Sequence, residues 1–163
     1  TMIGLVKSGH NVAVSRTFSK IYGLAGQRIG YIISQPEVIQ SIIKNGTGHF
    51  SVSLTGLAGA ISSYNDQEFL NYSKSKIIEA REMINDAVAS NGLSALPSQT
   101  NFVFVNIGDL NANEFRDQMK QHGILIQGQY GSFKNWSRVS MGKIEDIQRY
   151  VDALPKVLDA LGN

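Results

Sequence analysis

The sequence has 163 residues, of which 42% are hydrophobic and 17% charged, a composition typical of a folded chain with an apolar core. Its 15 lysines and arginines and 13 aspartates and glutamates leave a formal net charge of +2, which gives no argument for nucleic acid binding. The absence of cysteine excludes disulfide scaffolds, cysteine-ligated zinc and thiol nucleophiles. No apolar run approaches the roughly 20 residues of a membrane span, so no membrane partner is expected. We expect a cytoplasmic protein, and any N-terminal leader would lie outside this sequence, which shows no targeting signal.

The first half of the chain is predicted to alternate short strands with helices. Two apolar runs, 12–14 and 29–33, are bounded by polar residues and indicate buried strands. Pro36 then favours a helix start, because its fixed φ suits the first helical position, and Asn45-Gly46 favours the stop. The remaining predicted elements are a loop rich in glycine and serine at 46–53 and two helices, at 53–64 and at 66–91.

The second half is predicted to form a smaller unit that also mixes strands and helices. Apolar runs predict strands at 102–105, 124–126 and 136–141, and the spacing of apolar residues predicts helices at 113–121 and 145–161. The long helix that precedes them is the expected linker between the two parts. This order of elements predicts an α/β fold.

The aromatic residues and the histidines of this sequence suggest no separate site. Three aromatic residues on the predicted strands are expected to belong to the core rather than to a stacking platform: Phe102, Phe104 and Trp136. The three histidines are far apart and lack metal-ligand spacing, so surface or helix-cap positions are expected for His10, His49 and His122. No metal site is predicted.

One segment carries most of the chemical information, SRTFSKIYGLAGQRIGY at residues 15–31. It begins where the first strand is expected to end, and ligands of open α/β sheets collect at the carboxyl ends of strands. Lys20 in that position is expected to be partly desolvated, so that a neutral amine is available to attack an aldehyde. Gly23 and Gly26 remove side chains, which allows a tight turn and close packing against a ligand.

The same segment supplies groups that suit a phosphate. Thr17 and Ser19 contribute hydroxyl groups, and Arg28 contributes a planar set of charged donors. Together with the amine of Lys20, these groups match the aldehyde and the phosphate of pyridoxal phosphate. The residues therefore predict a site for this cofactor.

This segment resembles the lysine signature of the class I and II aminotransferases, which are pyridoxal-phosphate enzymes of fold type I. It is most similar to the histidinol-phosphate aminotransferase group. The resemblance implies that pyridoxal 5'-phosphate is the cofactor, that Lys20 is the catalytic Schiff-base lysine and that Arg28 binds the cofactor phosphate. It also implies that Thr17 and Ser19 are hydroxyl contacts of that phosphate.

A second match lies near the C-terminus, WSRVSMG at residues 136–142. It resembles the family motif whose arginine grips the substrate carboxylate as a bidentate pair, which implies this role for Arg138. Asn101 precedes Phe102 and resembles the Asn-Phe pair that opens the small domain in this group. That resemblance implies a substrate-binding role in orienting the carboxylate or Arg138, with a plain strand-entry cap as the alternative.

The resemblance also implies an architecture, in which the chain is the C-terminal part of a fold type I enzyme. Residues 1–75 correspond to the end of the cofactor-binding large domain, and residues 76–163 to the small α/β domain. Three family features that precede the lysine do not occur here: the acidic partner of the pyridinium nitrogen, the phosphate-binding helix N-terminus and the aromatic that stacks on the ring. The chain by itself is therefore expected to be an incomplete, inactive portion.

The activity implied by the resemblance is transamination between an amino acid and a 2-oxo acid, in a homodimer. Two alternatives stay open: a decarboxylase of the threonine-phosphate decarboxylase type, and a non-catalytic fragment or module of the same fold. Histidinol-phosphate aminotransferases carry an arginine for the substrate phosphate where this sequence has Gln127, and an amide brings no charge. A neutral or aromatic amino acid is therefore the expected substrate.

Overall fold

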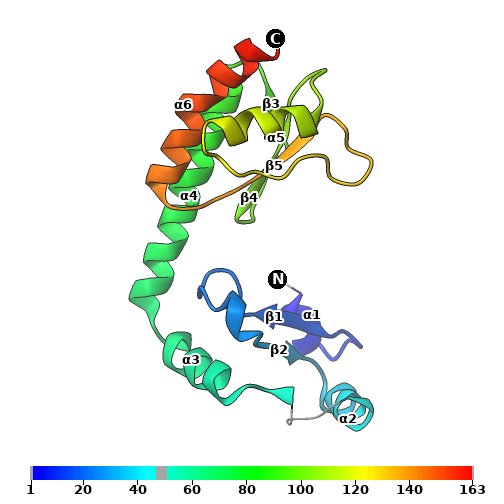
Figure 1. The fold of residues 1–163 in the computed structure, drawn as a ribbon. Helices are drawn as coiled ribbons and strands as arrows, with labels where there is room; N and C mark the ends of the chain where they lie inside the picture. Colours follow the sequence, from blue (N-terminus) through cyan, green and yellow to red (C-terminus); the bar gives the residue numbers. More distant parts are fainter. Residues whose placement is uncertain (1, 47–50, 163) are drawn as a thin grey trace. The chain divides into compact units, whose positions relative to one another are not determined.

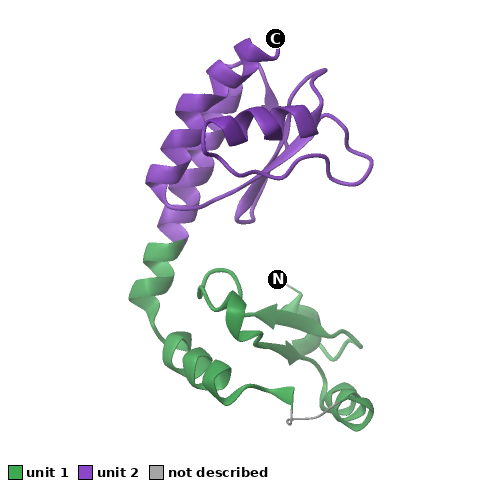
Figure 2. Cartoon of the chain, in the orientation of Figure 1, with its two compact units in different colours: residues 1–73 green, residues 74–163 purple. Residues whose placement is uncertain are grey.

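The computed structural model describes residues 2–46 and 51–162 (Figure 1). The chain divides into two compact units, residues 1–73 and residues 74–163, and the division falls within helix α4 (Gln67–Ser90) (Figure 2). The helix predicted at 66–91 is thus confirmed. Residues 47–50 of the predicted loop at 46–53, including His49, lie outside the described residues.

The first unit combines a two-stranded antiparallel sheet with short helices. Strand β1 (Val14–Thr17) pairs with β2 (Gly30–Ile33), so that Val14 lies opposite Ile33 and Thr17 opposite Gly30. The other elements of the unit are α1 (Ile3–Lys7), the 3-10 helix η1 (Ala25–Gln27), α2 (Pro36–Asn45), α3 (Leu54–Tyr64) and the start of α4. The predicted helices at 36–45 and 53–64 are confirmed, with Ser53 as the N-cap of α3.

The first predicted strand is wrong in its bounds. Residues 12 and 13 pair with no strand, while Ser15, Arg16 and Thr17 continue the strand that begins at Val14. The apolar run favoured Val12 and Ala13, but pairing with β2 selects the residues that join the ladder. The prediction that both strands are buried is also wrong, since most residues of β1 and β2 are exposed in this chain.

The second unit packs a three-stranded antiparallel sheet against helices. The strand order is β3 (Ser94–Ala95), β4 (Phe102–Asn106), β5 (Trp136–Ser140), and the predicted strands at 102–105 and 136–141 are confirmed within a residue. Helix α6 (Ile144–Ala160) lies beside the C-terminal part of α4, and α5 (Ala112–Gln121) completes the unit (Figure 1). The fully buried side chains at the centre of this core include Ile84, Val103, Val105, Phe115, Met119 and Leu154.

The aromatic residues of β4 and β5 do not belong to this core, so that prediction is wrong. Val103 and Val105 are buried, whereas Phe102 and Phe104 are half-buried, because successive residues of a strand point to opposite faces of the sheet. Phe104 stacks on Trp136 with ring centroids 5.0 Å apart. The aromatic residues therefore gather on the face of the sheet that the valines leave free.

The strand predicted at 124–126 does not form. Ile124 and Ile126 pack against the core while Leu125 is 82% exposed, and only Gln127 makes a single bridge, to Arg138. An alternating apolar pattern needs a continuous partner to become a strand, and here only one residue pair is in register.

In the part of the chain that the structure describes, no helix is long and apolar enough to cross a membrane. The described residues also contain no group of three or more histidine, aspartate or glutamate side chains that could hold a metal ion. Of the histidines, His10 is exposed and His122 is the C-cap residue of α5, as expected.

The core of the second unit contains one unsatisfied polar atom among the described residues, the hydroxyl of Tyr150 in α6. The residue is 1% exposed, and burial raises the pKa of this hydroxyl well above its usual value. A buried hydroxyl without a hydrogen bond costs free energy of folding.

We therefore expect Tyr150→Phe to leave the free energy of unfolding unchanged or to raise it by about 1 kcal/mol. Urea unfolding followed by circular dichroism measures the effect. Tyr130→Phe, the same change at an exposed tyrosine, is the matched control. A clear loss of stability in Tyr150→Phe alone would mean that the hydroxyl has a hydrogen-bond partner.

Candidate functional site

The predicted lysine lies in the loop that joins β1 to β2. Pairing of Thr17 with Gly30 closes the ends of this loop, and the Phe18 amide donates a hydrogen bond to the Ile29 carbonyl over 3.2 Å. Inside the loop, the Gly23 amide donates to the Lys20 carbonyl over 2.9 Å. The loop is thus closed at its base and turned tightly directly after the lysine.

Only one of the two loop glycines has the conformational role that was predicted for it. Gly23 has φ of 70°, in the left-handed region where a side chain is strained. Gly26 has no positive φ, and a Cβ added there would meet no atom within 4 Å. The turn therefore requires glycine at position 23 and not at position 26.

The two predicted hydroxyl groups form a pair at the start of the loop. The Thr17 hydroxyl donates to the Ser19 hydroxyl over 2.8 Å, and the Ser19 amide donates to the Thr17 hydroxyl over 3.0 Å. The proton of the Ser19 hydroxyl is used by no acceptor in the described part of the chain, so it can be donated to a ligand.

Arg28 ends η1 in a conformation that the sequence did not suggest. Its φ of 51° and ψ of 47° are left-handed, and it is the only residue other than glycine with positive φ in the described ranges. Its Nη1 donates to the Ala25 carbonyl over 2.9 Å, which leaves other guanidinium donors for a ligand. Strained residues of this kind concentrate at ligand-binding positions, which makes Arg28 a candidate on conformation as well as on charge.

Two parts of the physical argument for Lys20 are wrong. The strand before it ends at Thr17, and its sheet is antiparallel, so the rule for the carboxyl ends of parallel strands does not apply. Lys20 is also exposed rather than partly desolvated, because it lies on a surface loop of the first unit. Within this chain its amine is accessible to a ligand.

The second predicted arginine, Arg138, lies on the aromatic face of the sheet in the second unit. It is opposite Phe104 in the ladder, and its guanidinium carbon lies 4.7 Å from the centroid of the Phe102 ring. In the described part of the chain, no carboxylate or carbonyl accepts a hydrogen bond from this half-buried guanidinium. Arg138 therefore keeps its full set of donors for an anionic ligand.

Two cavities lined by described residues include Arg138 in their walls. The first, of about 300 Å³, we call the aromatic pocket; it is lined by residues 96–100, Phe102, Phe104, Tyr130 and Arg138. The second, of about 350 Å³, we call the Gln127 pocket; it is lined by Leu125, Ile126, Gln127, Arg138 and Ser140. Arg138 is the only charged residue in either lining.

Asn101 contributes its backbone to the sheet that carries Arg138. Its carbonyl accepts a hydrogen bond from the Met141 amide over 2.9 Å, which extends the pairing of β4 with β5 by one step. Its side-chain amide makes no hydrogen bond with other described residues, Arg138 included. A side-chain cap at the strand entry is therefore absent in the described chain, and the amide is available to a ligand.

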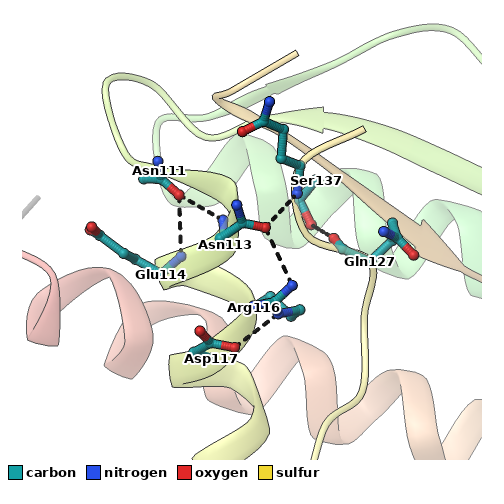
Figure 3. Close-up of polar contacts among 8 residues, drawn as sticks. Asn111, Asn113, Glu114, Arg116, Asp117, Gln127 and Ser137 are labelled. Atoms are coloured by element: carbon teal, nitrogen blue, oxygen red, sulfur yellow. Dashed lines mark hydrogen bonds and ion pairs between the residues drawn. The ribbon is translucent and has the colours of Figure 1, made fainter. Parts of the chain in front are cut away.

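A cluster of polar contacts holds the segment that contains Gln127 (Figure 3). The Ser137 hydroxyl donates to the Gln127 carbonyl over 3.3 Å. The side-chain oxygen of Asn113 accepts from the Gln129 amide over 3.1 Å and from Arg116 over 3.3 Å. The start of α5, where Asn111 is the N-cap, thus fixes the segment next to Arg138, an arrangement that the sequence analysis did not predict.

The structure therefore brings the predicted residues together in two groups. Ser19, Lys20 and Arg28 lie on one loop of the first unit, and Thr17 is the strand residue at its base. Asn101 and Arg138 lie on adjacent strands or strand ends of the second unit. The first group offers an amine, hydroxyls and a cation, and the second an amide and a cation.

Comparison with known proteins gives consistent matches over nearly the whole chain. The family model of aminotransferase class I and II matches residues 1–154. A histidinol-phosphate aminotransferase 1 from Oceanobacillus iheyensis is 31% identical and is aligned over 96% of this chain and 45% of its own length. A histidinol-phosphate aminotransferase from Syntrophus aciditrophicus is 33% identical, over 95% of this chain and 44% of its own. The chain thus spans about half the length of the curated relatives it matches.

Solved structures match as well. The histidinol-phosphate aminotransferase of Sinorhizobium meliloti, crystallised in complex with pyridoxal-5'-phosphate, superposes with a TM-score of 0.82 at 38% identity. The match covers 93% of this chain and 42% of that protein. A crystal structure from Erwinia carotovora atroseptica superposes with a TM-score of 0.92 at 28% identity, over 98% of this chain and 46% of its own. The fold is therefore that of the C-terminal part of a fold type I aminotransferase.

The closed base of the lysine loop depends on Gly30. A Cβ added there would lie 2.5 Å from the Arg16 carbonyl oxygen, so the two strands would have to separate. We expect Gly30→Ala to destabilise the first unit by about 2 kcal/mol or more. Hydrogen exchange of the β1 and β2 amides measures the loss of protection.

Gly26→Ala is the matched control, because it adds the same methyl group to the same loop without a clash. We expect it to leave the amide protection of β1 and β2 unchanged. Equal effects of the two substitutions would contradict the packing argument.

Proposed function

The chain belongs to the class I and II aminotransferase family, and on that premise we propose that it forms the lysine- and arginine-bearing part of a pyridoxal-phosphate-dependent transaminase. The reaction moves an amino group between an amino acid and a 2-oxo acid. In this proposal residues 1–75 belong to the cofactor-binding large domain, residues 76–163 form the small domain, and the enzyme is a homodimer. The chain covers about 45% of the length of its relatives, which agrees with its being one part of a longer enzyme.

The lysine loop has the groups that pyridoxal phosphate requires. Lys20 presents an exposed amine to the cofactor aldehyde, and Arg28 and the paired hydroxyls of Thr17 and Ser19 present donors to its phosphate. When bound, this cofactor supplies a ring that accepts electrons from the substrate Cα. The observation that carries the proposal is that Ser19, Lys20 and Arg28 lie on one loop whose base is closed by Thr17.

The other residues have roles toward the substrate. Arg138 would hold the α-carboxylate by a bidentate pair, since its donors are unused and its plane rests on Phe102. Asn101 would donate its free amide to the same carboxylate. The amine of Lys20 would take a proton from the substrate Cα and return one, as general base and acid.

An amino-transfer assay on the holoenzyme that contains this chain tests the proposal. We expect an amino acid to convert 2-oxoglutarate to glutamate, without release of carbon dioxide from the amino acid. Release of carbon dioxide in place of amino transfer would assign the site to a decarboxylase. If neither amino transfer nor release of carbon dioxide is observed, the chain belongs to a non-catalytic module.

Lys20→Ala tests the lysine itself. We expect amino transfer to fall by at least about 10²–10⁴-fold, because the general base is lost. Treatment with borohydride in the presence of pyridoxal phosphate should label the Lys20 peptide of the unmodified sequence and no peptide of the variant. Lys44→Ala, at an exposed lysine in the last turn of α2, is the matched control and should keep both label and activity. Labelling of another lysine in Lys20→Ala would contradict the assignment.

The uncharged side chain of Gln127 leads to a prediction about which substrate is preferred. The backbone bridge from this residue to Arg138 places an uncharged residue next to the arginine proposed to bind the carboxylate. The backbone of Lys134 is also fixed, because its carbonyl accepts a hydrogen bond from the Ala112 amide. A phosphate substrate would miss one charge-assisted contact, so we expect phenylalanine, tyrosine, leucine or glutamine to exceed histidinol phosphate in kcat/KM by about 10–100-fold. Steady-state kinetics on the holoenzyme measures the ratio. A tenfold preference for histidinol phosphate would mean that another group, with Lys134 first, binds the phosphate.

A further inference from the structure

Ser73 in α4 makes a contact with the lysine loop, residues 18–29, that the roles above leave unexplained. Its hydroxyl donates a hydrogen bond to the Ile21 carbonyl over 3.1 Å. Serine hydroxyls inside helices commonly bond to the carbonyl four residues earlier, as that of Ser63 in α3 does to Gly59 over 2.7 Å. The hydroxyl of Ser73 instead leaves its own helix and holds the loop.

This hydrogen bond falls directly beside Lys20. The Ser19 amide already donates to the Thr17 hydroxyl over 3.0 Å, and the Lys20 carbonyl accepts from the Gly23 amide over 2.9 Å. The bond from Ser73 fixes the next carbonyl along the chain. The backbone is therefore held on both sides of the Lys20 Cα.

The two halves of the lysine loop rest on different helices. Helix α3 packs against the second half, where a Cβ added to Gly56 would lie 3.0 Å from the Gln27 carbonyl oxygen. Within the described ranges, Ser73 gives the only side-chain hydrogen bond from beyond the loop and its base to the first half, residues 18–23. The half that carries Lys20 therefore has its polar anchor on α4.

We propose that Ser73 is a positioning residue for Lys20, which it holds in place through the Ile21 carbonyl. The inference rests on the proposed function, since it concerns the amine that moves the proton there. The Lys20 side chain is exposed and makes no hydrogen bond or ion pair with other described residues, so only its backbone sets where the amine lies. Loss of the Ser73 hydroxyl frees that backbone, and a reacting group that is poorly placed loses rate.

Hydrogen exchange measures this anchor without reference to activity. In the cofactor-free form of the enzyme that contains this chain, we expect Ser73→Ala to speed exchange of the Gly23 and Leu24 amides, which are bonded inside the loop, by about fivefold. The amides of β1 and β2 should exchange as before, because the strand ladder is untouched. Ser63→Ala is the matched control, since it removes a half-buried serine hydroxyl that bonds only within α3.

Kinetics of the holoenzyme show whether the anchor serves the lysine. We expect Ser73→Ala to lower kcat of amino transfer by about 3–10-fold and to leave KM for the amino acid unchanged, because the amine is displaced and the carboxylate site is not. Borohydride labelling of Lys20 in the presence of pyridoxal phosphate should slow by a similar factor. Ser73→Thr keeps a hydroxyl at this position, so its kcat and labelling rate should match those of the unmodified enzyme.

The outcomes separate this inference from the proposed function. If Lys20→Ala abolishes amino transfer while Ser73→Ala changes neither kcat, labelling nor loop exchange, the proposed function stands and the positioning role is wrong. The positioning role is also wrong if Ser63→Ala has the same effects, if Ser73→Thr is as slow as Ser73→Ala, or if Ser73→Ala removes protection from β1 and β2 as well. If Lys20→Ala keeps its activity, the proposed function fails first.

Discussion

Antiparallel pairing of β4 with β5 is the constraint on which the second unit depends. Because side chains alternate along each strand, the register that buries Val103, Val105 and Val139 necessarily turns Phe102, Phe104 and Arg138 to the other face. A slip by one residue would exchange the two sets and bury an unpaired guanidinium, at a large cost in free energy. The hydrophobic core thus selects the register, and the register presents the arginine and its aromatic neighbours.

The same kind of pairing organises the first unit at smaller scale. Pairing of Thr17 with Gly30 closes a loop that carries a lysine, a serine and an arginine, with the threonine at its base. The close approach of the strands at Gly30 and the left-handed Arg28 both follow from closing that loop. Strand pairing therefore supplies the positions, and the loop residues supply the chemistry.

The two groups differ in how their surroundings act on them. Lys20 and Arg28 are exposed on their loop, whereas Arg138 is half-buried against an aromatic ring. A cation held on a ring in a partly apolar setting is oriented and poorly hydrated, so a carboxylate gains more from it than from a mobile surface charge.

The sequence by itself determined most of the helices, the strands at 102–105 and 136–141, and the identity of the lysine and arginine motifs. These rest on local patterns: capping, apolar periodicity and contiguous residue types. Tertiary structure alone decided which residues of the 12–17 region pair, that 124–126 is no strand, and that the phenylalanines of β4 line a pocket. Each of these depends on a partner distant in the sequence, because a strand exists only through the ladder it joins, and a residue is buried only by what packs against it.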